Sequence, residues 1–145
     1  VVVSPAAPGA LFFQGGETAI PPLLDLIEAW YPPEGSRVHL AGVSNGGLSA
    51  FRVALDSPDR FSSILVAPGF PPEEADWARL GELATVPMLL IVGGEDTGWL
   101  KPMQRLRDTM TEAGDRVELI VSKGEGHIVR NVASERLLDF LDSTR

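Results

Sequence analysis

The chain has 145 residues, which suits one domain around one hydrophobic core, and we expect a single domain over residues 1–145. Its formal net charge is −8 and no basic patch stands out, which argues against nucleic acid as a partner. The absence of cysteine excludes disulfides, thiolate metal sites and a cysteine nucleophile. No apolar run is long enough to span a membrane and no secretion signal is visible, so we expect a cytoplasmic protein.

Short aliphatic runs alternate with helical patterns along the whole chain. The expected strands are Val1–Val3 and residues 37–41, 63–67, 88–92 and 116–121, and the expected helices cover about residues 21–32, 46–56, 73–80, 100–113 and 131–141. This alternation predicts an α/β fold with about five parallel strands joined by right-handed crossovers. In such sheets the reactive groups collect at the carboxyl ends of the strands.

One motif follows the second expected strand directly. Residues 42–46 read Gly-Val-Ser-Asn-Gly, between the strand at 37–41 and the helix at 46–56. A Gly-x-Ser-x-Gly segment in this position puts its serine, Ser44, on a sharp turn with the hydroxyl exposed above the sheet. Glycine is abundant here, with 15 residues, so the motif alone could also arise by chance.

Two further residues follow later strands in the order that serine catalysis requires. Asp96 comes after the strand at 88–92, and His127 comes after the strand at 116–121. Because the pKa of histidine lies near neutrality, its imidazole can take the proton of a serine hydroxyl, and a carboxylate can orient that imidazole. We therefore predict Ser44, Asp96 and His127 as nucleophile, acid and base at one edge of the sheet.

Other residues could fill these roles less well. Glu95 could replace Asp96 as the acid, and Glu125 adjoins His127 but is expected to be solvated. His39 is the other histidine, and it lies inside an expected strand, where a packed side chain is its usual role. No group of His, Asp and Glu has metal-ligand spacing, so we expect neither a metal nor a cofactor.

The sequence resembles the α/β-hydrolase superfamily, and among its members the small esterases of the phospholipase/carboxylesterase, esterase D and polyhydroxybutyrate-depolymerase-like groups. The segments that carry the resemblance are Val38–Gly47, Ser57–Phe61, Val92–Asp96 and Gly124–His127. The resemblance covers about residues 37–145, and it implies the same roles for Ser44, Asp96 and His127. It also implies a reduced form of the fold, because the family sheet usually has eight strands.

The loop that would stabilise an oxyanion is the main departure from that family. In the family, the strand carrying this loop lies beside the nucleophile strand, so a five-stranded sheet needs Val1–Val3 in that position. The loop Pro5–Gly9 would then face Ser44, with backbone N–H groups of Asn45 and of Ala6 or Ala7 as donors. In the alternative, Val1–Val3 matches the next strand of the family and the oxyanion loop is lost.

The order of the elements also predicts a lopsided protein. If the strands follow one another in order, the first four helices cover one face of the sheet and only the helix at 131–141 reaches the other. Helices then lie on both faces, most of them on one. The second face would stay partly bare and apolar, which suggests a homodimer or another contact.

The predicted function is that of a serine carboxylesterase that acts on small or accessible esters. About 20 residues separate the third and fourth expected strands, which leaves no room there for a cap domain. Phe12, Phe13, Phe70 and Trp99 are candidates for the substrate pocket, although each could equally belong to the core. The alternative is a non-catalytic or inactive binding domain of the same fold. A flavodoxin-like receiver or nucleotide module also fits five parallel strands, but no phosphate loop or acidic receiver cluster follows the first strand.

Overall fold

The structure, a computed structural model, describes residues 1–6 and 15–145, and within them four parallel strands form one sheet in the order β1-β2-β3-β4. The strands are β1 (Val38–Gly42), β2 (Phe61–Val66), β3 (Met88–Gly93) and β4 (Val117–Ser122). The central strand β3 is apolar apart from its final glycine and buried at every position, as expected for a parallel strand covered on both faces. The edge strand β1 alternates instead between half-buried and exposed residues.

Helices connect the strands and continue beyond the sheet at both ends. The α-helices are α1 (Ile20–Trp30), α2 (Asn45–Asp56), α3 (Glu74–Ala78), α4 (Thr97–Glu112) and α5 (Ser134–Asp142). Single 3₁₀ turns lie at Gly16–Ala19, Glu34–Ser36, Pro58–Arg60 and Leu80–Leu83. Proline at the start of α1 suits a first turn, where its missing N–H is not needed.

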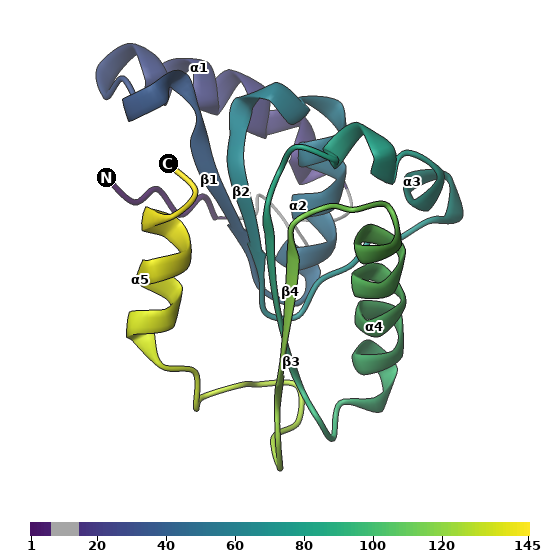
Figure 1. Cartoon of the computed structure of the whole chain (residues 1–145). Coiled ribbons are helices and arrows are strands. Elements are labelled where there is room, and N and C mark those ends of the chain that lie inside the picture. Colours follow the sequence, from purple (N-terminus) through teal and green to yellow (C-terminus); the bar gives the residue numbers. More distant parts are fainter. Residues whose placement is uncertain (7–14) are drawn as a thin grey trace.

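The two faces of the sheet are covered unequally, as predicted. On one face, α1, α2 and α4 pack with the turn at Leu80–Leu83 against Ile64, Met88 and Leu90 in the main core. On the other face, α5 contributes Phe140 to a small second cluster with Leu89 and Ile91. Figure 1 shows the helix α5 on one side of the sheet and the helices α2 and α4 on the opposite side.

Among residues 1–6 and 15–145, that second face is partly exposed at β1. His39 and Ala41 point to it and are exposed. Leu65, which pairs with Ala41 across the two strands, is half-buried against the second cluster, and Ser63, which pairs with His39, is buried. The homodimer expected through this face stays a prediction.

The first expected strand is wrong. Val1–Val3 form no strand, and the residues Val1 and Val2 are 91% and 95% exposed. A three-residue apolar run has little to hold it extended unless a neighbouring strand pairs with it, because strand stability comes from cross-strand pairs. The sheet therefore has four strands in the described residues, and β1 lies at its edge.

The remaining elements are confirmed with shifts of up to three residues at their ends. The largest shifts concern α4, which begins at Thr97 instead of residue 100, and α5, which begins at Ser134 instead of 131. The start of α4 follows from Asp96, whose carbonyl accepts the N–H groups of Trp99 (3.1 Å) and Leu100 (2.8 Å). Within residues 1–6 and 15–145, no helix has the length and apolar character needed to cross a membrane.

Candidate active site

Ser44 lies on a strained turn between β1 and α2. Its backbone has φ 55° and ψ −120°, a conformation with positive φ that non-glycine residues rarely adopt. Backbone hydrogen bonds hold the turn on both sides: the Ser44 N–H donates to the Pro68 carbonyl (3.0 Å), and the Ser44 carbonyl accepts the Gly47 N–H (2.8 Å). Strain of this kind persists only where its surroundings enforce it, and it is found mostly at functional sites.

The tightness of the turn explains the first glycine of the motif. A Cβ on Gly42 would lie 2.2 Å from the carbonyl oxygen of Gly46, which is too close for any side chain. A Cβ on Gly46 would meet no heavy atom within 4 Å outside its own helix. Gly42 is therefore required by the approach of the helix backbone, whereas Gly46 is not required by packing.

The structure brings the three predicted residues into one chain of hydrogen bonds. The Oγ of Ser44 lies 2.7 Å from Nε2 of His127, and Nδ1 of His127 lies 2.6 Å from Oδ2 of Asp96. An ionised carboxylate can only accept, so Nδ1 carries the proton and donates it to Asp96. Nε2 is then free to accept the Ser44 hydroxyl proton. The side chain of Asp96 is 12% exposed and that of His127 is 41% exposed, so the imidazole is open to solvent.

The loops that carry Asp96 and His127 touch through their backbones. A Cβ on Gly93, the last residue of β3, would lie 2.0 Å from the carbonyl oxygen of Gly126. Next to this contact, the N–H of Glu95 donates to the carbonyl of Glu125 at 2.9 Å, and the N–H of Gly94 donates to the carbonyl of Ser122 at 2.8 Å. The loops that carry Asp96 and His127 therefore belong to one connected piece of backbone.

The sequence analysis predicted a solvated Glu125, but in the structure this side chain makes several hydrogen bonds. Its carboxylate accepts the hydroxyl of Ser122 (2.5 Å), the backbone N–H of Arg130 (3.0 Å) and the amide side chain of Asn131 (2.8 Å). These hydrogen bonds, that of Ser122 above all, lower the pKa of Glu125 below its ordinary value.

The side chains of the competing candidates take no part in the hydrogen bonds that join Ser44, His127 and Asp96. Glu95 is exposed, and the His127 ring bonds to Asp96. His39 is exposed on the second face of the sheet, where β1 is the edge strand. Its Nδ1 lies within hydrogen-bond distance of the hydroxyls of Ser63 (2.8 Å) and Ser62 (3.0 Å), and partial desolvation lowers the pKa of its imidazole.

Of the predicted pocket residues, Trp99 lies beside the imidazole and Phe70 lies against Trp99. The Trp99 ring lies 5.0 Å from the His127 ring and 5.1 Å from the Phe70 ring, between ring centroids. Phe70 and Trp99 are half-buried and also pack against the main core. Phe12 and Phe13 fall outside the described residues.

The structure bears differently on each of the expected oxyanion donors. Asn45 is the first residue of α2, where backbone N–H groups have no partner within the helix. Ala6 loses its topological argument, because Val1–Val3 is no strand beside β1, and it stays a prediction. Ala7 falls outside the described residues.

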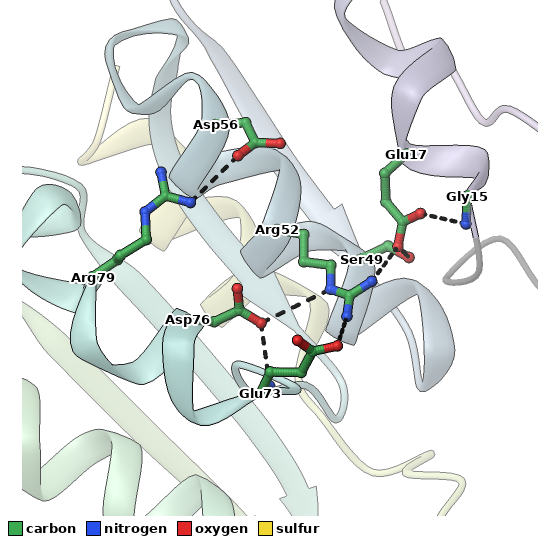
Figure 2. A network of polar contacts seen from close by, with 8 residues as sticks. All are labelled: Gly15, Glu17, Ser49, Arg52, Asp56, Glu73, Asp76 and Arg79. Atoms are coloured by element: carbon green, nitrogen blue, oxygen red, sulfur yellow. Dashed lines mark hydrogen bonds and ion pairs between the residues drawn. The ribbon is translucent and has the colours of Figure 1, made fainter.

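A polar network that the sequence did not reveal braces the helix behind Ser44 (Figure 2). Ser49, on α2, donates to Glu17 at 3.0 Å, and Glu17 also accepts the N–H of Gly15 at 2.9 Å. On the same helix, Arg52 pairs with Glu73 at 2.5 Å, at the start of α3. The network joins segments that are more than 20 residues apart, so no local pattern could have indicated it.

Solved structures with a similar fold include several esterases. Acyl-protein thioesterase 2 from Zea mays superposes with a TM-score of 0.68 at 18% identity, over 98% of this chain and 70% of the thioesterase. The Bacillus cereus carboxylesterase gives 0.71 at 15% identity, over 92% and 62%. A thermostable esterase gives 0.65 at 13% identity, over 85% and 30%. The chain thus spans between about one third and two thirds of these relatives.

These similarities define the class as the α/β-hydrolase fold, as the resemblance in sequence had implied. The model of the Esterase family, described as "Putative esterase", matches residues 19–143. The chain belongs to this family. No curated protein matches it in sequence.

Proposed function

We propose that the protein is a serine carboxylesterase in which Ser44 is the nucleophile, His127 the general base and Asp96 the orienting acid. The observation that carries this proposal is the continuous hydrogen-bond chain from the Ser44 hydroxyl through the imidazole to Asp96, at 2.7 and 2.6 Å. The strained turn at Ser44, with φ 55°, supports it independently, because it exposes the hydroxyl at the carboxyl end of β1.

The reaction proceeds in two halves. Ser44 Oγ attacks the ester carbonyl carbon while its proton passes to Nε2 of His127, and a tetrahedral oxyanion forms. The oxyanion collapses, the C–O bond to the alcohol breaks, and the alcohol leaves with the proton from Nε2. Water then attacks the acyl-enzyme with His127 again as base, so the carboxylic acid departs and Ser44 is restored. Asp96 stabilises the imidazolium in both halves.

The oxyanion needs donors close to Ser44. In this proposal the first is the backbone N–H of Asn45, the residue after the nucleophile and the first of α2. Its place at the positive end of a 12-residue helix favours a developing negative charge. Removing one such donor typically costs ~10²–10³ in kcat.

The surroundings favour small or accessible esters. Between β2 and β3 the chain holds only the five-residue helix α3 and a 3₁₀ turn, so no cap domain lies over the site from this connection. The Trp99 ring beside His127, with the Phe70 ring against it, offers an apolar surface for an acyl or alcohol group.

The test is hydrolysis of a short p-nitrophenyl ester by the wild type, Ser44→Ala and the control Ser62→Ala. Ser62 bonds to His39 on the far face of β1, so its loss removes a hydroxyl without touching the site. We expect Ser44→Ala to lose at least ~10³-fold in kcat/KM and Ser62→Ala to match the wild type. Full activity of Ser44→Ala would contradict the proposal. No hydrolysis by any of the three would favour the non-catalytic binding domain.

A further inference from the structure

We propose that Glu125 is a positioning residue for His127, whose carboxylate fixes the loop that carries the imidazole. The inference rests on the proposed function, because it concerns the base of that reaction. His127 lies in the segment 123–133 between β4 and α5, which contains neither helix nor strand. Such a segment has no ladder of backbone hydrogen bonds to hold a ring in place, so its position depends on individual contacts.

The Glu125 side chain supplies contacts to both ends of this segment. On the strand side, Oε2 accepts the hydroxyl of Ser122, the last residue of β4, at 2.5 Å. On the helix side, Oε1 accepts the Arg130 backbone N–H at 3.0 Å and the Asn131 side-chain amide at 2.8 Å, and Oε2 accepts the Asn131 N–H at 3.4 Å. One carboxylate therefore ties together the two ends of the backbone loop from residue 122 to residue 131, and His127 is one of the residues in that loop.

The backbone of Glu125 connects the same loop to the acid. Its carbonyl accepts the N–H of Glu95, the residue before Asp96, at 2.9 Å. Through this bond and the side-chain contacts, Glu125 links the two loops whose separation sets the distance from His127 Nδ1 to Asp96 Oδ2. Transfer of a proton along such a chain is sensitive to displacements of about 1 Å, which can cost ~10² in rate.

The hydrogen bonds that converge on the Glu125 side chain need a carboxylate as their acceptor. Four donors converge on two oxygens, and an ionised carboxylate offers acceptor positions on both. A glutamine would keep one oxygen as acceptor and turn the other into an NH₂ that faces donors. An alanine would remove every side-chain contact and leave the backbone bond to Glu95 intact.

The experiment compares Glu125→Gln and Glu125→Ala with the control Glu112→Ala, which removes the same charge from an exposed position at the end of α4. With a p-nitrophenyl ester, we expect kcat to fall ~10-fold in Glu125→Gln and ~10²-fold in Glu125→Ala. KM should stay within about twofold, because substrate contacts are unchanged. The control should keep both constants.

Proton NMR gives a readout that does not depend on turnover. The proton between His127 Nδ1 and Asp96 should give a low-field resonance in the wild type and in Ser44→Ala, and it should broaden or vanish in Glu125→Ala. Wild-type kcat and an unchanged resonance in Glu125→Ala would overturn the inference. If Ser44→Ala kept full activity, the proposed function would fail while this resonance still tested the positioning of His127.

Two milder variants keep the inference testable if Glu125→Ala does not fold. Ser122→Ala and Asn131→Ala each remove one side-chain partner of the carboxylate. We expect each to lower kcat by about fivefold, in line with the loss of one hydrogen bond. Wild-type kcat in both would contradict the inference.

Discussion

The carbonyl oxygen of Gly126 lies 2.0 Å from the position that a Cβ on Gly93 would take, so the loop before His127 rests directly on the end of β3. This contact, one residue from His127 on one side and three from Asp96 on the other, brings the two side chains close together. Any side chain at residue 93 must push the two loops apart. The atoms that it would meet belong to the backbone, which cannot move aside as the end of a flexible side chain can.

Gly93→Ala should therefore impair the site more than the fold as a whole. We expect kcat/KM to drop at least ~10²-fold and the free energy of unfolding to fall by about 1–3 kcal/mol, from overpacking. The matched control is Gly81→Ala, where a Cβ meets nothing within 4 Å. Enzyme assays and urea unfolding measure both effects, and equal behaviour of the two variants would refute the contact as a constraint.

The two outer glycines of the motif should differ in their tolerance to substitution. Gly42→Ala places a methyl group 2.2 Å from the Gly46 carbonyl oxygen and should destabilise the protein by about 1–3 kcal/mol. Gly46→Ala meets open space within the first turn of α2 and should be neutral or stabilising by up to about 1 kcal/mol, from helix propensity. Thermal unfolding of both variants checks the difference, and comparable losses in Tm would count against it.

Comparing Asp96→Asn with Glu95→Gln should show which of these two neighbouring carboxylates acts as the acid. The amide would offer Nδ2 or Oδ1 to the imidazole and favour the wrong tautomer, so we expect kcat to fall ~10³–10⁴-fold. Stability should change little, because the Asp96 side chain makes no cap bond to α4. Glu95→Gln should keep activity, since Glu95 is exposed and the imidazole bonds to Asp96. A larger loss in Glu95→Gln than in Asp96→Asn would assign the acid to Glu95.

The lowered pKa of Glu125 predicts a pH dependence with a definite sign. A carboxyl group whose pKa is lower in the folded than in the unfolded state stabilises the protein above the unfolded value, here its ordinary 4.5, and loses this contribution as the pH falls through the folded value. The difference in unfolding free energy between the wild type and Glu125→Gln should thus be largest near neutral pH and shrink below about pH 4.5. A difference that grows in acid would contradict this assignment.

Much of the site could be predicted from sequence because its signals are local. Ser44, Asp96 and His127 each follow a strand within a few residues, and parallel topology brings strand ends to one edge. The role of Glu125 could not be predicted in this way, since its partners Arg130 and Asn131 are loop residues without a pattern.

The errors in the predicted fold have the same origin. Val1–Val3 has the composition of a strand, but strand formation depends on a neighbour that the segment itself does not encode. The start of α4 was expected at residue 100. The structure begins this helix at Thr97, because the Asp96 carbonyl already accepts the N–H groups of Trp99 and Leu100.

The most direct measurement of the central claim is covalent labelling with a fluorophosphonate, followed by mass spectrometry of the labelled peptide. Only a serine whose hydroxyl is activated by a base reacts rapidly with this probe. The account predicts one probe per chain, attached to Ser44, with no labelling in Ser44→Ala and labelling slowed at least ~10²-fold in His127→Ala. A wild-type protein that stays unlabelled, or that carries the probe on another residue, would contradict it.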